Sequence, residues 1–206
     1  MASAAILAGG RGRRFGGRDK SALVIAGRSI RDRQLDELRM LTDDIMVVGA
    51  RDPIAGTRGV ADRMPGSGPL GGLDAALAAA RDEEVLVLAC DMPFVTAPFL
   101  RYLLDLTADH NVVVPRTERG FHPLCAAYTR RCHSVVRQQL AARRLALSEL
   151  LGLFDEVAVR VVEAHEIERF GNVEWLLANV NTPDDLDNLD NLDRVDTLEA
   201  LPGHEP

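Results

Sequence analysis

Short apolar runs alternate along the chain with longer segments in which apolar residues recur at helical spacing. The runs that fit buried strands occupy 4–7, 45–48, 85–89 and 112–114. The segments with helical spacing lie at 30–41 (after the N-cap candidate Ser29), at 68–80 and at 96–106. Alternating strands and helices predict an α/β protein whose mainly parallel sheet is covered by helices on both faces.

The second half of the chain continues this alternation with weaker signals. We expect an apolar segment at 123–127, a basic helix at 130–144, a short helix at 147–152, a strand at 157–162 and a final helix from Pro183. No linker rich in proline, glycine or serine separates them, and 206 residues suit one ordinary domain. Residues 1–206 are therefore expected to form a single domain.

Composition and charge exclude several classes of protein. Hydrophobic residues make up 47% of the chain and aromatic residues only 4%, which predicts a globular protein with an aliphatic core. The net charge of -7 argues against binding to nucleic acid or to a membrane surface. The three cysteines lack CxxC spacing, so we expect reduced thiols. No apolar stretch reaches the length of a membrane span, and the expected location is the cytoplasm.

The segment Leu7 to Lys20, with the sequence LAGGRGRRFGGRDK, carries the strongest chemical signal. Positions 11–33 hold eight Arg or Lys residues and two Asp, against the acidic balance of the whole chain. Gly9 and Gly10 would let backbone amides approach a phosphate closely. Arg14 and Lys20 could neutralise the β and γ phosphates of a nucleotide. The alternative is a solvated basic loop, which the strand before it disfavours.

Two familiar phosphate loops do not fit this segment. A P-loop has glycine directly before its lysine, whereas Asp19 precedes Lys20. The dinucleotide fingerprint GxGxxG fails because Phe15 occupies the last glycine position when the count starts at Gly10. We therefore expect a phosphate loop of another kind.

Asp91 is the candidate metal ligand. It follows the strand at 85–89 in the sequence CDMP, where its side chain would leave the carboxyl end of the sheet. A carboxylate there can hold Mg²⁺, which prefers oxygen ligands and bridges phosphates. The alternative is that Asp91 only starts the turn before Pro93.

Four other polar residues are weaker candidates. Asp62 could accept hydrogen bonds from a base or a ribose, or be an ordinary loop acid. His122 is as well explained by structure as by a substrate contact. Asn179 and Asn181 carry donor and acceptor groups suited to a polar heterocycle or a phosphate. The next two residues, Thr182 and Pro183, fit a helix start without any functional role.

These motifs together resemble the molybdenum cofactor guanylyltransferases of the MobA type. The first loop is similar to the family signature LAGGxxxRMGGxDK, and GPLGGL, CDMP, HPL and NVNTPDDL follow in the family's order and spacing. The resemblance spans about 5–190. It implies a three-layer, Rossmann-like nucleotidyltransferase fold, with a nucleotide-binding part at about 1–110 and an acceptor-binding part at about 111–195.

The resemblance also implies the reaction, which is transfer of GMP from GTP to molybdenum-molybdopterin with release of pyrophosphate. Mg²⁺ would be the cofactor, and molybdoenzymes or other cofactor-synthesis proteins would be further partners. The residues that match nucleotide-binding positions of the family are Leu7, Ala8, Gly9, Gly10, Lys20, Asp62 and Asp91. Asn179 and Asn181 would face the pterin.

The sequence departs from the family pattern at two places. Phe15 replaces the usual methionine, and the stretch 48–51 lacks an asparagine that some members place there for GTP. Three alternatives stay open: a cytidylyltransferase, a sugar-phosphate nucleotidylyltransferase, and a GTP-binding cofactor carrier without catalysis.

Overall fold

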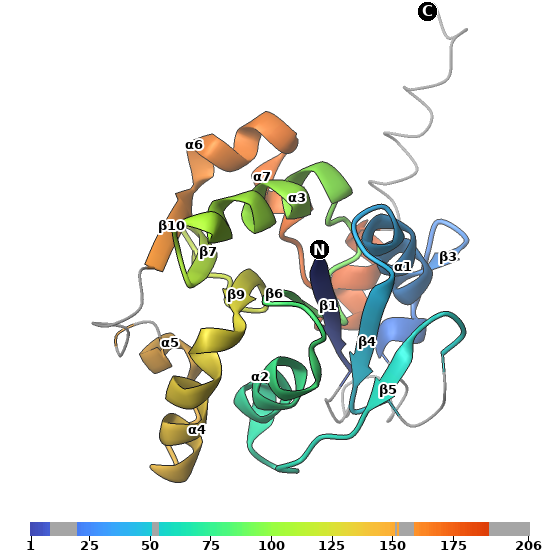
Figure 1. The fold of residues 1–206 in the computed structure, drawn as a ribbon. Helices are drawn as coiled ribbons and strands as arrows, with labels where there is room; N and C mark the ends of the chain where they lie inside the picture. Colours follow the sequence, from blue (N-terminus) through green and yellow to red (C-terminus); the bar gives the residue numbers. More distant parts are fainter. Residues whose placement is uncertain (9–19, 51–53, 151, 153–158, 190–206) are drawn as a thin grey trace, which may run out of the picture.

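A single mixed sheet forms the centre of the computed structural model, which describes residues 1–8, 20–50, 54–150, 152 and 159–189 (Figure 1). The strand order is β10-β7-β9-β6-β1-β4-β5, and β8 pairs with β7. The bounds are β1 Ala2–Leu7, β4 Asp44–Val48, β5 Arg58–Val60, β6 Glu84–Ala89, β7 Val112–Thr117, β8 Gly120–Phe121, β9 Cys125–Thr129 and β10 Val159–Glu163.

The sheet is mainly parallel, as predicted. Neighbouring pairs from β6 through β1 and β4 to β5 are parallel, and so is β7 with β10. The expected apolar segment at 123–127 corresponds to β9, which runs antiparallel to both β6 and β7. The short strand β8 is also antiparallel to β7. Alternation of strands and helices could not reveal these reversals, because it carries no information on strand direction.

Helices cover both faces of the sheet and complete the predicted three layers (Figure 1). The helices are α1 Ile30–Arg39, α2 Gly68–Ala79, α3 Ala97–Asp105, α4 His133–Ala141, α5 Leu147–Leu150, α6 Ala164–Ile167 and α7 Val173–Leu176. Residues of α1, α3, α6 and α7 join one core cluster, and residues of α2, α4 and α5 join the cluster on the other face. Successive residues of β1 alternate between the two, because strand side chains alternate in direction.

A third, smaller cluster joins the beginning of the chain to its end. Ile25, Ile30 and Val180 are fully buried in it. Ile25 lies in the hairpin of β2 (Val24–Ile25) and β3 (Arg28–Ser29), which precedes α1. Leu186 and Leu189 pack against the same cluster from the helical turns at 183–189. This cluster fixes the segment around residue 180 against the first quarter of the chain.

The helix ends expected from sequence are present. The Ser29 side chain accepts a hydrogen bond from the backbone N–H of Asp32, which confirms it as the N-cap of α1. The final helix begins after Thr182, whose hydroxyl accepts from the N–H of Asp185 at 3.1 Å. The basic helix expected at 130–144 is shorter, since α4 follows a 3-10 turn, η4 (Arg130–Cys132), and ends before Arg143 at φ 55°.

Several short elements were not expected from sequence. They are β5, β8, the β2–β3 hairpin, α6, α7 and the 3-10 turns η2 (Lys20–Ala22), η3 (Leu106–Ala108) and η6 (Glu168–Phe170). None exceeds four residues, too few to establish a period. All three cysteines are buried, and burial raises the pKa of Cys125 to about 12. No helix within the described ranges has the length and hydropathy needed to cross a bilayer.

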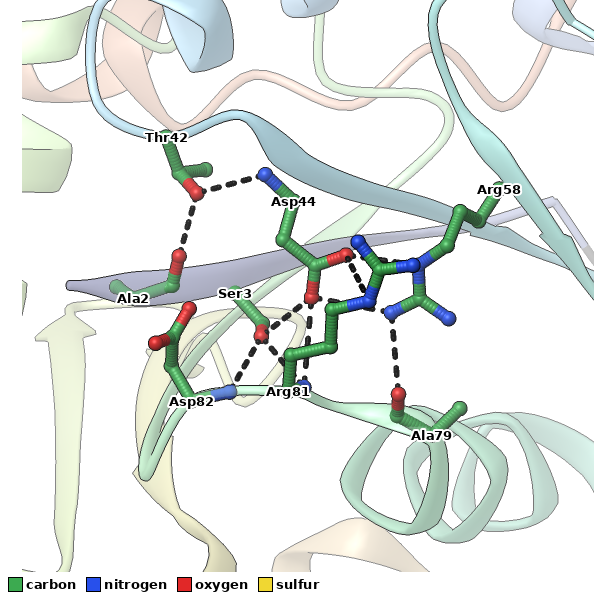
Figure 2. A network of polar contacts seen from close by, with 8 residues as sticks. All are labelled: Ala2, Ser3, Thr42, Asp44, Arg58, Ala79, Arg81 and Asp82. Carbon is green, nitrogen blue, oxygen red and sulfur yellow. Dashed lines mark hydrogen bonds and ion pairs between the residues drawn. The ribbon is translucent and has the colours of Figure 1, made fainter.

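A dense polar network closes the amino edge of the sheet (Figure 2). The Asp44 carboxylate, whose side chain is 8% exposed, receives Arg58 through Nε at 2.7 Å and Nη2 at 3.0 Å. The Ser3 hydroxyl donates to the same carboxylate at 2.6 Å and accepts from the backbone N–H groups of Arg81 and Asp82. This network ties the starts of β1, β4 and β5 to the segment after α2.

The network also sets the charge state of Asp44. Burial alone would raise the pKa of its carboxyl, but the hydrogen bonds from Arg58 and Ser3 and the charge of Arg58 hold that pKa below its ordinary value. Asp44 is therefore an ionised structural group at the edge of the sheet opposite to the predicted site.

Candidate functional site

Two neighbouring parallel strands end side by side at the carboxyl edge of the sheet. Leu7, the last residue of β1, is in register with Ala89, the last residue of β6. Beyond them, the Cys90 N–H donates to the carbonyl of Leu7 at 3.4 Å, and the Ala8 N–H donates to that of Val48 at 2.9 Å. The segments after β1 and β6 thus leave the sheet together, at the edge where α/β sheets bind ligands.

Three of the side chains selected from sequence meet beyond this edge. The Lys20 ammonium donates to Asp91 Oδ2 at 3.1 Å and to Asn181 Oδ1 at 2.9 Å. The side chains of Lys20 and Asp91 are 21% and 17% exposed, so they are partly shielded from water and still reachable. Lys20 and Asn181 are 161 positions apart in sequence. A cation, a carboxylate and an amide from three distant segments therefore form one cluster.

The backbone around Asp91 and Asn181 is held by specific hydrogen bonds. The Val180 N–H donates to the carbonyl of Asp91 at 2.9 Å. The Asp185 carboxylate accepts from the N–H groups of Asn181 and Thr182 at 2.8 and 2.9 Å. The bond from the Asn181 N–H is the main cause that lowers the pKa of Asp185, and the nearby Lys20 charge adds to it. Asp185 is a site-building residue that sequence reasoning did not single out.

The backbone of Lys20 is linked by hydrogen bonds to the start of helix α1. It opens the turn η2, where the Leu23 N–H donates to its carbonyl at 3.1 Å. The Ile30 N–H donates in turn to the carbonyl of Leu23 at 2.9 Å. Ile30 belongs to the third apolar cluster together with Val180, next to Asn181. The same cluster thus supports both ends of the Lys20–Asn181 hydrogen bond.

Gln34 is a second residue that sequence reasoning did not select. It is fully buried on α1, and its Nε2 donates to the carbonyls of Ala89 at 2.7 Å and Met92 at 3.0 Å. A weak signal existed in the sequence, because Gln34 lies four residues from both Ile30 and Leu38 on the apolar face of the helix. A polar residue at that spacing is unexpected unless it bonds to something buried.

Asp62 lies against the start of α2. Its Oδ1 accepts from the N–H of Met64 at 2.9 Å, and an added Cβ at Gly71 would lie 3.3 Å from the same oxygen. A Cβ at Gly72 would lie 3.1 Å from the Leu7 side chain. The glycines of GPLGGL therefore allow α2 to pack closely on β1 and beside Asp62. The role of Asp62 toward a nucleotide stays a prediction.

His122 lies in the connection between β8 and β9 and not in the Lys20 cluster. Its Nε2 is 2.9 Å from the Thr117 hydroxyl, and its backbone bonds to Pro115 and Cys125. Burial, with the charge of Arg119, lowers the pKa of His122 below its ordinary value. These contacts favour the structural explanation, and an acceptor-binding role stays a prediction.

The remaining candidates divide into two groups. Asn179 is exposed, two residues before Asn181. Gly9, Gly10 and Arg14 lie outside the described residues. Their contacts with phosphates stay predictions.

The donor set at Asp91 fits a magnesium ion shared with a nucleotide. Within the described residues, no group of three or more His, Cys, Asp or Glu side chains could enclose a metal. Mg²⁺ is commonly held by one or two carboxylates together with substrate phosphates. Oδ2 of Asp91 receives the hydrogen bond from Lys20, and no side chain in the described ranges donates to its other oxygen. Asp91 can thus supply one carboxylate ligand while phosphates supply others.

A mainly parallel sheet covered on both faces, with a lysine and a carboxylate beyond its carboxyl edge, is typical of α/β nucleotide-binding proteins. Residues 4–161 match the family described as the MobA-like NTP transferase domain. The chain belongs to this family and is a nucleotidyltransferase, as its motifs predicted.

Individual relatives and solved structures show which members of the family the chain is similar to. The chain is 32% identical, over 90% of each protein, to a probable molybdenum cofactor guanylyltransferase of Pelotomaculum thermopropionicum. The crystal structure of molybdopterin-guanine dinucleotide biosynthesis protein A from Archaeoglobus fulgidus superposes with a TM-score of 0.79 at 23% identity, covering 95% of this chain and 100% of that one. A Mycobacterium tuberculosis protein solved in complex with manganese gives 0.64 at 19% identity, covering 92% and 98%. The two structures show a shared fold.

Proposed function

We propose that this protein transfers GMP from GTP to the phosphate of molybdenum-molybdopterin, forming molybdopterin guanine dinucleotide and pyrophosphate. The observation that carries the proposal is the Lys20 ammonium held between Asp91 and Asn181 in a member of this family. Relatives named as molybdenum cofactor guanylyltransferases match across nine-tenths of the chain, which favours GTP over CTP. Asp91 would serve on the nucleotide side and Asn181 on the acceptor side.

In the proposed reaction, an oxygen of the pterin phosphate attacks the α phosphorus of GTP. The bond between that phosphorus and the oxygen that bridges the α and β phosphates breaks, and this oxygen leaves with pyrophosphate. The attacking phosphate is ionised at neutral pH, so no protein base or nucleophile is needed. Lys20, with Arg14, stabilises the charge that develops on the departing pyrophosphate. When bound at Asp91, Mg²⁺ neutralises phosphate charge and orients the phosphates.

The other predicted residues have positioning roles in this proposal. Leu7, Ala8, Gly9 and Gly10 contact the guanine and the phosphates, and Asp62 accepts from the base or the ribose. The part at about 1–110 binds the nucleotide, and the part at about 111–195 binds the acceptor. Asn179, Asn181 and His122 face the acceptor. We place the reaction in the cytoplasm, with molybdoenzymes or other cofactor-synthesis proteins as further partners.

Calorimetric titration tests the nucleotide first, because the pterin is labile. The protein is titrated with GTP, CTP and ATP, each with and without Mg²⁺, and Mg-GTP is expected to bind most tightly. A single-turnover assay with molybdenum-molybdopterin then measures pyrophosphate. Preference for CTP would assign a cytidylyltransferase instead, and GTP binding without pyrophosphate release would favour a non-catalytic carrier.

A further inference from the structure

Gln34 is a fully buried polar side chain that bonds to the backbone on both sides of the Asp91 turn, and the proposed mechanism leaves it without a role. Its single amide nitrogen donates to the carbonyls of Ala89 and Met92, at 2.7 and 3.0 Å. These two carbonyls flank Cys90 and Asp91, the residues of the turn that follows β6. Both hydrogens of the amide are thereby used to hold the start and the end of this turn together.

The orientation of the Gln34 amide follows from its partners. Both contacts are carbonyl acceptors, so the nitrogen and not the oxygen must point toward the turn. The side-chain oxygen is left buried without a hydrogen-bond partner among the described residues. An apolar side chain of the same length would fill this place without burying an unpaired oxygen. Packing alone therefore does not explain a glutamine here, whereas two directed hydrogen bonds do.

The turn is held from two sides. From α1, Gln34 fixes the carbonyls on each side of Asp91, and from the chain's last described segment the Val180 N–H fixes the carbonyl of Asp91 itself. With the backbone restrained in this way, the direction of the Asp91 side chain toward Lys20 is set before any ligand arrives. Preorganised groups stabilise developing charge because they need no reorganisation during the reaction.

We propose that Gln34 is a positioning residue, which holds the Asp91 turn in the geometry that binds a metal–nucleotide complex. This inference rests on the proposed function, since it assigns Asp91 to the metal. Gln34 itself touches neither substrate nor metal. Its loss should therefore weaken the metal-dependent part of nucleotide binding and leave binding of metal-free nucleotide nearly unchanged.

The chain offers a closely matched control in Gln139. This glutamine is 2% exposed on α4, its Nε2 donates to the carbonyl of Ala146 at 3.0 Å, and its oxygen is likewise buried without a described partner. It belongs to the helical layer on the opposite face of the sheet from α1. Substitution of Gln139 therefore repeats the loss of a buried amide without touching the Asp91 turn.

The experiment measures GTP binding by calorimetry with and without Mg²⁺ for wild type, Gln34→Met and Gln139→Met, and the unfolding temperature of each. We expect the Mg²⁺-dependent gain in affinity to fall about 10-fold or more in Gln34→Met, the scale on which outer-shell partners of metal ligands act. Gln139→Met should keep the wild-type Mg²⁺-dependent gain in affinity, even if its unfolding temperature falls by as much as that of Gln34→Met. Turnover of Gln34→Met should recover partly at high Mg²⁺.

Equal Mg²⁺-dependent gains in the two variants would overturn the role of Gln34. If Gln34→Met does not fold, Gln34→Glu provides the second measurement, because a neutral carboxyl can donate one of the two hydrogen bonds and a carboxylate can donate neither. The Mg²⁺-dependent gain in GTP affinity of Gln34→Glu, divided by that of wild type, should then increase as pH is lowered from 8 to 6. If this ratio is the same at both pH values, the role of Gln34 is contradicted. If wild type itself gains nothing from Mg²⁺, the proposed function fails instead.

Discussion

Asp44 and Asp91 lie at opposite edges of the same sheet, and each is paired with a basic side chain. Asp44 receives two nitrogens of Arg58, the Ser3 hydroxyl and the N–H of Arg81, so its carboxylate is almost fully hydrogen-bonded. The Asp91 carboxylate receives a single hydrogen bond within the described ranges, from Lys20. A carboxylate with all its partners inside the protein serves the fold, whereas one with an open oxygen can bind a ligand.

The largest effect should come from Asp91→Asn. This change removes the charge needed for a metal but preserves the shape of the side chain, so we expect GMP transfer to fall on the order of 10²–10³-fold. The unfolding temperature should move by less than about 4 °C, the shift that 1 kcal/mol causes in a protein of this size. Steady-state kinetics and calorimetric melting measure the two effects. Near-normal turnover would show that Asp91 does not hold the metal.

Lys20→Arg should lose about as much activity as Lys20→Met, roughly 10²-fold, although it keeps the charge. Lys20 is the only lysine in the chain, and its one nitrogen lies between two oxygens, those of Asp91 and Asn181. The planar guanidinium of arginine presents its donors as a fork and cannot replace a point charge at this place. Kinetics with GTP as the varied substrate would measure this, and full rescue by arginine would mean that only charge matters.

Asp44→Ala should show the reverse of the effects expected for Asp91→Asn, with a large loss of stability and little loss of turnover. The change leaves Arg58 without its main partner in a mostly buried network, so we expect about 3 kcal/mol of unfolding free energy to be lost. Turnover per folded molecule should stay within about twofold of wild type, because an error of a few tenths of a kcal/mol in such an argument corresponds to a change of about this size. Urea unfolding gives the free energy. Asp36→Ala is the control, because Asp36 pairs with Arg28 on an exposed surface and its loss should change neither quantity.

The smallest effect concerns acid stability, where a second fully bonded carboxylate can be tested. Burial opposes ionisation of Glu166, but hydrogen bonds from Arg160, Tyr102 and the Glu163 N–H lower its pKa to about 2 from an ordinary value of 4.5. Because the folded pKa is the lower one, this stabilisation is complete above about pH 4.5 and is lost as pH falls toward 2. Urea unfolding at pH 7, 4.5 and 3 should show a shallower acid decline for Glu166→Gln, and identical slopes would contradict the assignment.

The sequence was sufficient for most of the fold because its long elements have clear periods. The buried strands at 4–7 and 85–89 and the helices at 68–80 and 96–106 are found within a few residues of their expected bounds. The reversal of β9 was missed, since a buried strand is apolar in either direction. The unexpected strands and helices, of two to four residues, carry too few positions to show a pattern.

The site was predictable to the extent that motifs name charged residues. Lys20, Asp91 and Asn181 were selected from sequence, and the structure brings them together. The groups that hold them were not selected, because Gln34 is a single polar residue on the apolar face of a helix and Asp185 is one of several acidic residues in its segment. Their meaning depends on backbone atoms distant in sequence, which no local pattern contains.

The apolar cluster of Ile25, Ile30 and Val180 has a consequence for the order in which the protein matures during translation. The strands from β1 to β9 have all been synthesised by residue 129. Asn181 and the Val180 N–H follow the last strand, so every strand of the sheet is synthesised while Lys20 and Asp91 still lack their third partner. A chain that ends before residue 180 would therefore lack both the apolar contact of Val180 with Ile25 and Ile30 and the amide of Asn181 beside Lys20.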